Sequence, residues 1–292
     1  MKKVSVLDIK QFHEHDSAEH FYSNTLQNHL LTRHKDISHP HSHNFYLAIL
    51  FIQGSGTHEV DFTTYTITPG ALFFLNPGQT HNWQLSDDTQ GYIFFHTRDF
   101  YELHYTHNRL GQFPFYYSMR NMPCLYLKDN DLQQITLLFA TILSENHTDH
   151  ALKTNNIVSL VDIVYNYSTR LYLQENPLQT SGENLYYNKF RKLEEFVEQH
   201  FKQQKLPTYY ASLLAMTPRH LNRITQAVTG KTATDVILDR VLLEAKKELV
   251  LQRDSFANIA EALGYNDYAY FSRLFKNKTG QTPSEFLSKY RG

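Results

Sequence analysis

Apolar and polar positions alternate in two different ways along this chain. Between residues 45 and 95, short apolar and aromatic runs are separated by turn signals rich in Gly, Pro, Asn and Asp, and the runs cover residues 45–52, 58–62, 65–67, 71–75 and 92–95. Several short strands at this spacing predict an all-β sandwich or barrel. Beyond residue 130, apolar residues recur every three or four positions, which is the period of an amphipathic helix. Helices are therefore expected over residues 132–146 and 154–175.

The junction between the two halves differs in composition. Residues 176–183, Asn-Pro-Leu-Gln-Thr-Ser-Gly-Glu, have no apolar period, which is typical of a linker. The sequence thus predicts an N-terminal domain over residues 1–175, a linker over 176–185 and a C-terminal domain over 186–292. The first 36 residues are polar and weakly patterned. Either an arm packed on the next domain or a partly disordered segment fits them.

Residues 255–290 have the clearest helical pattern. Apolar residues such as Phe256 and Ile259 fall on one helical face, and Gly264 follows where a turn between packed helices uses a positive φ angle. A second helix then buries Phe271 and leaves a polar, basic face. Two short helices joined by a tight turn, with such a face on the second, have the geometry that enters a DNA major groove.

A second unit of the same kind lies fifty residues earlier. Six positions recur at this offset: Leu213, Leu221, Arg223, Thr229, Gly230 and Thr232 return as Leu263, Phe271, Arg273, Thr279, Gly280 and Thr282. Ala215 stands at the first turn, one residue off this register, so this turn is expected to be shorter. Thr217-Pro218 then predicts a helix start. A long helix over 236–251 connects the units, and a rigid connection would let them address successive major grooves, about 34 Å apart.

The C-terminal part contains Ala-Glu-Ala-Leu-Gly-Tyr at 260–265, Tyr-Phe-Ser-Arg-Leu-Phe-Lys at 270–276 and Thr-Gly-x-x-Pro-Ser-Glu-Phe at 279–286. These motifs resemble the C-terminal signature of the AraC/XylS family of bacterial transcription regulators. The N-terminal part looks like the cupin-like sensor domain common in that family, at His41, His43, Gly54, Gly56, Pro69, Gly70, Pro77, Gly78, His81 and Trp83.

This resemblance implies a multidomain α+β protein, with an N-terminal cupin-like β-barrel with helices and a C-terminal all-α domain with two helix-turn-helix units. It implies a sequence-specific DNA-binding regulator whose barrel senses a small molecule. Helices 132–146 and 154–175 would pair two subunits in a homodimer. The resemblance favours activation of transcription, with RNA polymerase as a partner, although no residue shows whether the regulator activates or represses. A regulator without an effector, whose barrel only supports dimerisation, stays open.

Side-chain chemistry indicates which residues would touch DNA. Arg219, Arg223 and Arg273 can each donate twice to guanine O6 and N7, and Asn222 can pair with adenine through both groups of its amide. Base and phosphate contacts both stay open for the arginines. The predicted DNA-binding set is Arg219, Asn222, Arg223, Gln226, Tyr268, Ala269, Ser272, Arg273 and Lys276.

Charge is distributed unevenly between the two parts. From residue 186 onward 17 Lys and Arg stand against 11 Asp and Glu, a net charge of +6, whereas the preceding residues carry 11 basic and 18 acidic side chains, a net charge of −7. A basic domain beside an acidic one indicates a polyanionic partner for the basic domain alone. Three lysines near helix ends, Lys231, Lys276 and Lys278, are expected to contact phosphates.

Cysteine content and the lengths of the apolar runs predict a cytoplasmic protein. The single Cys124 excludes an internal disulfide framework and fits a reducing environment. The first residues, MKKVSVLDIKQF, lack the continuous apolar run of a signal peptide. No apolar run approaches 18 residues, so no membrane span is expected.

A ligand or metal site is to be sought in the N-terminal domain, because 15 of the 17 histidines precede residue 186. Strand alternation places His41, His43, Phe45 and Leu47 on one face. Residues of later strands, Tyr92 among them, are expected to join them around a concave, mostly apolar site. The predicted effector-binding set is His41, His43, Phe45, His81, Trp83, Phe94 and His96.

A metal-dependent cupin enzyme fused to a DNA-binding module is the alternative. His41, His43, Glu59 and His81 offer nitrogen and carboxylate ligands that transition metals accept. However, residues 44–53 contain no carboxylate, where metal cupins have one after the paired histidines. Sensor domains of the resembled family generally bind an organic effector without metal, and an enzyme would not need a basic half with two reading units. We therefore expect no enzyme, no metal and no cofactor.

Overall fold

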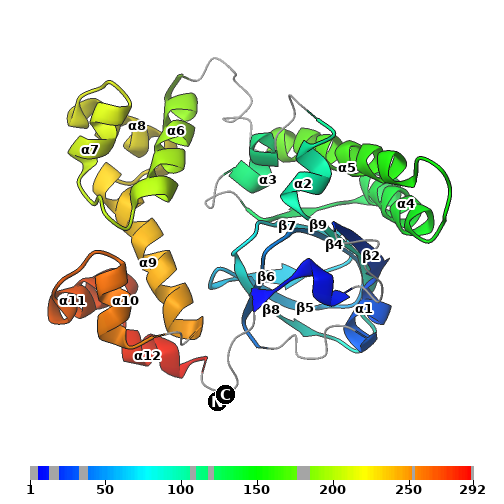
Figure 1. The fold of residues 1–292 in the computed structure, drawn as a ribbon, viewed down its shortest axis with the longest axis horizontal. Helices are drawn as coiled ribbons and strands as arrows, with labels where there is room; N and C mark the ends of the chain where they lie inside the picture. Colours follow the sequence, from blue (N-terminus) through cyan, green and yellow to red (C-terminus); the bar gives the residue numbers. More distant parts are fainter. Residues whose placement is uncertain are drawn as a thin grey trace. The chain divides into compact units, whose positions relative to one another are not determined.

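The computed structural model describes residues 6–12, 20–32, 39–105, 110–117, 122–175, 185–251 and 254–290. The chain divides into two compact units, centred on residues 5–176 and 177–292. The first is built of strands and helices, and the described part of the second is built of helices alone (Figure 1). The predicted linker over 176–185, apart from its last residue, lies outside the described residues.

Two five-stranded sheets make up the strands of the described N-terminal unit. Their strand orders are β1-β3-β8-β5-β6 and β10-β7-β4-β9-β2. The pair β1–β3 is parallel and the other pairs are antiparallel. The strands are β1 (Val6–Leu7), β2 (Phe21–Thr25), β3 (His41–His43), β4 (Tyr46–Gln53), β5 (Gly56–Val60), β6 (Thr63–Ile67), β7 (Ala71–Leu75), β8 (Thr80–Leu85), β9 (Gln90–His96) and β10 (Cys124–Tyr126).

An apolar core lies between the two sheets. On β4, Leu47, Ile49 and Phe51 point into it, whereas Ala48 and Leu50 belong to a second cluster on the opposite face. Because both faces of β4 are buried, its sequence is a continuous apolar run and not an alternating pattern. The prediction of a cupin-like β-barrel with helices is confirmed.

Two long helices cover the outer face of the sheet that contains β4 and β9 (Figure 1). They are α4 (Asp129–Asn146) and α5 (Lys153–Glu175), close to the predicted bounds. Their apolar stripes contribute Phe139 and Tyr165 to the cluster on that face. Shorter elements complete this unit: η1 (Ile9–Phe12), α1 (Leu26–Thr32), α2 (Arg98–Glu102), η3 (Leu110–Gln112) and α3 (Pro114–Tyr117).

Part of the weakly patterned N-terminal segment packs onto the barrel. β2 extends one sheet beside β9, with Phe21 opposite His96. The ring of Phe12 lies 4.9 Å from that of Phe95 in the core. These stretches therefore behave as an arm packed on the domain, whereas residues 13–19 and 33–36 lie outside the described residues.

The described C-terminal unit consists of helices grouped along α9 (Figure 1). Helices α6 to α8 contact one another at one end of α9, and α10 to α12 contact one another at the other end. None of the helices in the described ranges is long and apolar enough to span a bilayer. The helices are α6 (Leu185–His200), α7 (Pro207–Leu213), α8 (Pro218–Thr229), α9 (Ala233–Leu251), α10 (Phe256–Ala262), α11 (Tyr268–Thr279) and α12 (Pro283–Ser288).

Arg240 braces α9 against α6. Its Nε lies 2.6 Å from a carboxylate oxygen of Glu198 on α6, and its Nη1 lies 2.9 Å from Glu244 one turn along α9. The guanidinium carbon also lies 3.9 Å from the ring centroid of Phe201. This arrangement fixes α9, which is roughly 28 Å long at 1.5 Å per residue, as the connection between the two helix-turn-helix units.

Candidate functional sites

The first helix-turn-helix unit consists of α7 and α8. The turn passes through Ala215, whose φ of +49° is left-handed. Thr217 caps α8, since its side-chain oxygen accepts a hydrogen bond from the N–H of His220. Pro218 occupies the first helical position, where an N–H would have no partner within the helix. The predicted helix start at Thr217-Pro218 is confirmed.

The second unit consists of α10 and α11, and its turn requires glycine. Gly264 has a φ of +81°, and a Cβ at this position would lie 2.3 Å from the carbonyl oxygen of Lys202. Asp267 caps α11 by accepting hydrogen bonds from the N–H groups of Ala269 and Tyr270. Both recognition helices therefore start at a capping side chain next to their first turn.

Each recognition helix presents the predicted DNA-binding residues on the face opposite its buried one. The buried faces contain Leu221 and Ile224 in α8, and Phe271 and Phe275 in α11. Six predicted side chains are exposed: Arg219, Arg223, Gln226, Ala269, Arg273 and Lys276. Three are partly buried: Asn222, Tyr268 and Ser272.

Arg223 is held by two neighbours that the sequence did not reveal. Its Nη2 donates to Nδ1 of His220 over 3.0 Å, and its guanidinium carbon lies 5.6 Å from the ring centroid of Tyr186 on α6. Tyr186 also meets the His220 ring edge-on at 5.9 Å. Arg223 is therefore positioned before any partner arrives, and nothing local in the sequence indicates that α6 contributes to this.

Asn222 has a structural bond that the sequence analysis missed. Its Oδ1 accepts a hydrogen bond of 3.1 Å from the N–H of Ala233, the first residue of α9. The oxygen is thus engaged within the protein, and the NH2 group remains for an outside partner. The expected two-bond pairing of Asn222 with adenine would therefore require Oδ1 to accept a second hydrogen bond beside the one from Ala233.

Two of the three lysines expected at phosphates are in ion pairs. Lys231 Nζ lies 2.8 Å from Asp239, and Lys278 Nζ lies 2.7 Å from Asp235. In both pairs the side chains are partly exposed, so the bonds exchange readily with other charges. Lys276, in the last turn of α11, is the third, and its side chain is exposed.

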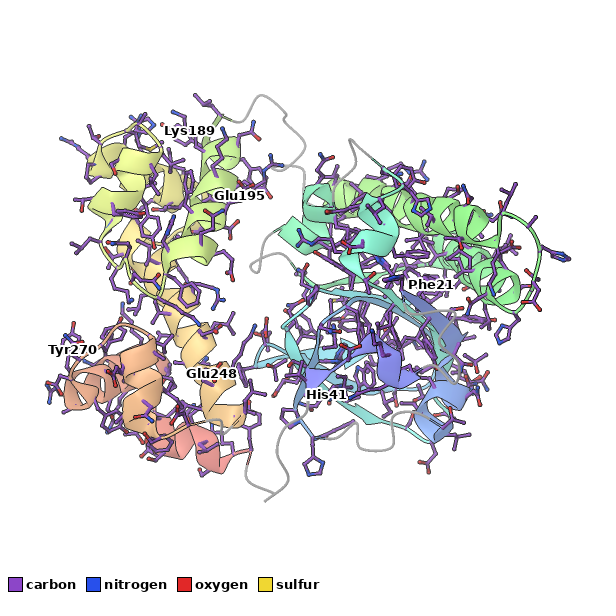
Figure 2. All side chains as sticks on the ribbon, viewed as in Figure 1. Phe21, His41, Lys189, Glu195, Glu248 and Tyr270 are labelled. Atoms are coloured by element: carbon purple, nitrogen blue, oxygen red, sulfur yellow. The ribbon has the colours of Figure 1, made fainter. Side chains whose placement is uncertain are left out.

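Tyr270 is an exposed aromatic residue that sequence reasoning passed over. It lies on the outer side of α11 (Figure 2) and is 52% exposed. Its ring lies 6.2 Å from that of Tyr265 in the preceding turn. A phenolic hydroxyl on a recognition helix has the chemistry to hydrogen-bond with a DNA phosphate.

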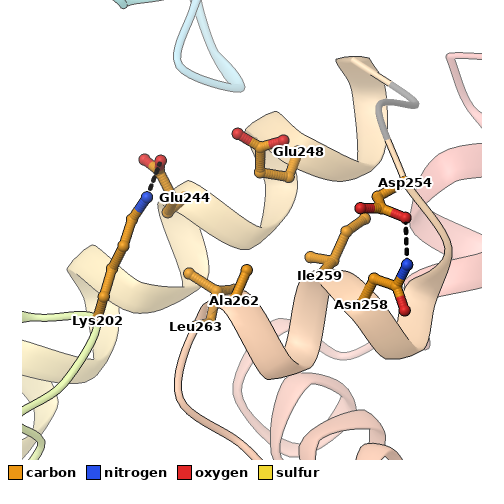
Figure 3. Close-up of a pocket in the computed structure, with 8 residues that line it drawn as sticks. All are labelled: Lys202, Glu244, Glu248, Asp254, Asn258, Ile259, Ala262 and Leu263. Carbon is orange, nitrogen blue, oxygen red and sulfur yellow. Dashed lines mark hydrogen bonds and ion pairs between the residues drawn. The ribbon is translucent and has the colours of Figure 1, made fainter.

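A pocket of about 170 Å³ lies between α9 and α10, where carboxylates and apolar side chains meet (Figure 3). Lys202 Nζ lies 3.6 Å from Glu244, and Asn258 donates to Asp254 over 2.5 Å. The surplus of carboxylates opposes phosphate binding here. The lining residues are Lys202, Glu244, Glu248, Asp254, Asn258, Ile259, Ala262 and Leu263.

In the N-terminal unit, buried imidazoles gather between the two sheets. His41 pairs with His81 across β3 and β8, and their ring centroids are 4.3 Å apart. His43 lies 5.1 Å from His81, and His58 Nε2 lies 3.0 Å from His81 Nδ1. Trp83 packs on the cluster, with its ring 5.0 Å from that of His81. We call His41, His43, His58 and His81 the histidine cluster; His58 is its one member that the predicted set lacks.

Backbone carbonyls fix the tautomers of two cluster members. His43 Nδ1 donates to the carbonyl of Phe45 over 2.7 Å, and His41 Nδ1 donates to the carbonyl of His39 over 3.0 Å. In the neutral ring the other nitrogen, Nε2, is then a hydrogen-bond acceptor. His43 Nε2 is buried and has no hydrogen-bond partner among the described residues.

Burial keeps the rings of His43 and His58 neutral. It lowers the pKa of His43 to about 3, with the nearby charge of a protonated His41 as a smaller cause. Burial also lowers the pKa of His58 well below its ordinary value of 6.5, and His41 and His43 add to the effect. At neutral pH the rings of His43 and His58 are therefore uncharged.

Two predicted effector residues lie elsewhere, so the expectation that Phe94 and His96 join this face is wrong. On β9, Phe95 points into the core between the sheets, whereas Phe94 points to the helix-covered face and packs 4.9 Å from Phe139. His96 Nε2 accepts a 2.6 Å hydrogen bond from Tyr165 on α5. Tyr92 shares their face. Successive residues of a strand alternate, so even-numbered positions of β9 cannot reach the cluster.

The carboxylate that the metal alternative needs is also absent from the cluster. Glu59 follows His58 on β5 and points to the opposite face, where it accepts a hydrogen bond from Asn82 over 3.2 Å. Within the part of the chain that the structure describes, no three His, Cys, Asp or Glu side chains are arranged to hold a metal ion.

Two parts of the chain match known families. Residues 210–289 match the family model described as a helix-turn-helix domain, and residues 30–95 match the one described as an AraC-like ligand binding domain. These segments contain both recognition helices and the histidine cluster. The matches thus coincide with the two candidate sites.

Relatives match over most of the chain. YfiF of Bacillus subtilis (strain 168), named an uncharacterized HTH-type transcriptional regulator, is 24% identical over 264 residues, 86% of this chain and 79% of that protein. RhaS of Yersinia pestis (strain Pestoides F), named an HTH-type transcriptional activator, is 22% identical over 256 residues, 85% and 89% of the two chains. A solved structure of ToxT from Vibrio cholerae aligns over 94% of this chain and all of that one, with 14% identity and a TM-score of 0.48.

Proposed function

On the premise that this chain is a member of the AraC family of transcriptional regulators, with an AraC-like ligand-binding domain followed by a helix-turn-helix domain, we propose that it activates transcription in response to a small molecule. The small molecule binds in the N-terminal unit. Its binding shifts how the C-terminal units of two subunits occupy DNA together, a coupling between separate sites. The protein acts in the cytoplasm, as a homodimer and without enzymatic activity.

One observation carries the DNA-binding part of the proposal. Two capped recognition helices, each with a polar and basic exposed face, stand at the two ends of the braced helix α9. Such helices enter successive major grooves about 34 Å apart. Arg219, Arg223 and Arg273 read guanine or hold phosphates, and Lys276 adds sequence-independent attraction. Gln226, Tyr268, Ala269 and Ser272 complete the contact faces.

The histidine cluster supports a defined class of effector. His43 offers a buried acceptor nitrogen with no partner among the described residues, inside a wall that includes Phe45 and Trp83. A buried acceptor is stabilised by a donor. We therefore expect a small molecule with hydroxyl or amine groups and an apolar face that stacks on the aromatic rings. Phe94 and His96 act only indirectly, through Tyr165 on α5.

Activation and dimerisation extend the proposal. RhaS is named an activator, so contact with RNA polymerase is the partner interaction we expect. The helices α4 and α5 expose Leu137 (62%) and Ile163 (47%), which supports their pairing with a second copy. The enzyme alternative is not favoured, because no group of described His, Cys, Asp and Glu side chains at the cluster is arranged to hold a metal ion.

DNA selection by the full-length protein tests this function. Purified protein is incubated with genomic fragments at moderate salt, and bound fragments are sequenced. We expect enrichment of a motif with two half-elements about one helical turn apart. The variant carrying both Arg223→Ala and Arg273→Ala serves as control and should lose the motif while keeping its fold. Diffuse, salt-sensitive binding by the unaltered protein would contradict sequence-specific reading.

The effector part has its own test. Thermal unfolding of the full chain is followed by Trp83 fluorescence in the presence of small polyhydroxylated or amine-containing molecules, since a bound ligand raises the transition temperature. His43→Gln should abolish any such shift, whereas His147→Gln, which changes an exposed histidine outside the cluster, should keep it. Loss of the shift in both variants would refute binding at the cluster.

A further inference from the structure

The two helix-turn-helix units differ at the position where each recognition helix meets the next helix. Asn222 in α8 and Ser272 in α11 are equivalent at the fifty-residue offset, and so are Ala233 and Pro283, the first residues of α9 and α12. Asn222 Oδ1 accepts a hydrogen bond from Ala233 N–H over 3.1 Å. Proline has no N–H, so the second unit has no donor at this place.

This pair of differences has a common physical cause. The first N–H groups of a helix have no partner within the helix and need an outside acceptor. Thr232 caps α9 and satisfies the N–H of Asp235, which leaves Ala233 for Asn222. In the second unit Thr282 and Glu285 form a capping box, and Pro283, at the position of Ala233, has no N–H to satisfy. An acceptor is therefore required at residue 222 and not at residue 272.

The bond determines what Asn222 can offer to DNA. With Oδ1 bonded to the first N–H of α9, the amide plane is fixed and the NH2 group, a donor only, remains for an outside partner. Guanine presents two major-groove acceptors, N7 and O6, whereas adenine presents one acceptor and one donor. An amide that offers donors alone matches guanine and meets the adenine N6 amino group with a second donor.

We propose that Asn222 is a specificity-determining residue that selects guanine over adenine, and that Ala233 N–H sets this choice by holding the amide oxygen. The inference rests on the proposed function, in which α8 enters the major groove. Ser272 is not restrained in this way, because its side chain makes no such bond within the described residues. The two recognition helices thus differ in how far their central polar residue is fixed in advance.

A cycle of full-length variants tests the bond: Asn222→Ala, Ala233→Pro and the two combined. Ala233→Pro is tolerated at the first position of a helix, as Pro283 is in the second unit. Asn222→Ala alone should lower the unfolding temperature of the helical unit by about 3–6 °C. Hydrogen exchange of α8 and α9 at increasing temperature measures this change. In the Ala233→Pro background, Asn222→Ala should have no effect. Equal losses in both backgrounds would overturn the proposal.

Selection from randomised duplexes tests the readout with the same proteins. The unaltered chain should prefer guanine at one position of the duplex. Asn222→Ala should lose the preference at that position and keep the preferences at the others. Ala233→Pro should release the amide and shift the preference at that position toward adenine by about five- to 100-fold. Ser272→Ala is the matched control and should change neither temperature nor this position. Adenine selected by the unaltered chain would overturn this inference alone. Absence of any sequence preference would overturn the proposed function with it, whatever the temperature cycle shows.

Discussion

The two units of this protein differ in where their candidate functional side chains lie: those of the N-terminal unit are buried, and those of the C-terminal unit are exposed. In the N-terminal unit, His43 and His58 are almost fully buried between two sheets. In the C-terminal unit, Arg219 and Arg273 extend from exposed helix faces. A buried group is coupled to the stability of its unit, whereas an exposed group contributes to binding with little effect on stability. This difference suits the N-terminal unit to a change in stability when a ligand binds, and the C-terminal unit to contact with DNA.

Acid should have the largest effect and should act on the N-terminal unit. The pKa of His43 is lowered to about 3 and that of His58 lies well below 6.5. The unfolded chain takes up these protons near pH 6.5, so the folded unit is fully stabilised above that pH and loses stability as the pH falls toward 3. His43 alone accounts for a loss on the order of 5 kcal/mol over this range.

Trp83 makes this prediction measurable. It is the single tryptophan of the chain and is buried beside the histidine cluster, so its fluorescence follows the N-terminal unit alone. Hydrogen exchange of α8 and α11 follows the other unit. We expect the Trp83 transition to occur at a higher pH than the opening of these helices. Trp83 emission that stays constant from pH 7 to pH 4 while the helices open would reverse the comparison.

A substitution in the second turn should have the next largest effect, and only in the C-terminal unit. Gly264→Val combines a left-handed φ with a Cβ 2.3 Å from the Lys202 carbonyl, which should destabilise the helical unit by roughly 2–5 kcal/mol. Urea unfolding monitored by hydrogen exchange of α11 measures it. Trp83 fluorescence should keep its midpoint.

The first turn supplies the control. Ala215 already adopts a φ of +49°, so Ala215→Gly should change stability by about 1 kcal/mol or less. If both substitutions have the same effect, the steric argument for the second turn is wrong.

Substitutions of the exposed arginines on the recognition faces should change binding and leave stability unchanged. Arg273→Ala and Arg223→Ala should each weaken binding to the target site by about 1–3 kcal/mol if they read bases. Tyr186→Ala should produce a smaller loss, because it removes only the ring beside Arg223. Titration of labelled duplexes at fixed salt measures these effects. Unchanged affinity would remove the arginine in question from the interface.

Lys276→Ala should have the smallest effect. A phosphate contact contributes equally on all sequences, so affinity should fall slightly on target and random duplexes alike, and the slope of log affinity against log salt should drop by about 1. Binding curves at several salt concentrations provide the slope. A loss confined to the target duplex would instead indicate base contact.

Local sequence rules were sufficient for the helical unit. The 3.6-residue period and the caps Thr217 and Asp267 act within a few residues of one another, so the helices and their exposed faces follow from neighbouring positions. The fifty-residue repeat applies the same local pattern to both helix-turn-helix units. The same reasoning placed His41, His43 and Phe45 on one face of the barrel wall, because alternation along a strand is also local.

Only the tertiary structure decided which strand faces and helix ends meet. The strands β4 and β9 are apolar on both faces, so no hydrophobic pattern distinguishes the face of Phe95 from that of Phe94 and His96. Likewise His58, and not its neighbour Glu59, enters the histidine cluster because of how β5 pairs with β8.

The same limit applies to the recognition helices. The bond from Asn222 to Ala233 and the contact of Arg223 with Tyr186 join residues on different helices. The sequence by itself determined which residues each recognition helix exposes, because periodicity and capping are properties of neighbouring residues. Packing between elements decided which of those exposed groups are already held, because that depends on positions the chain brings together only when it folds.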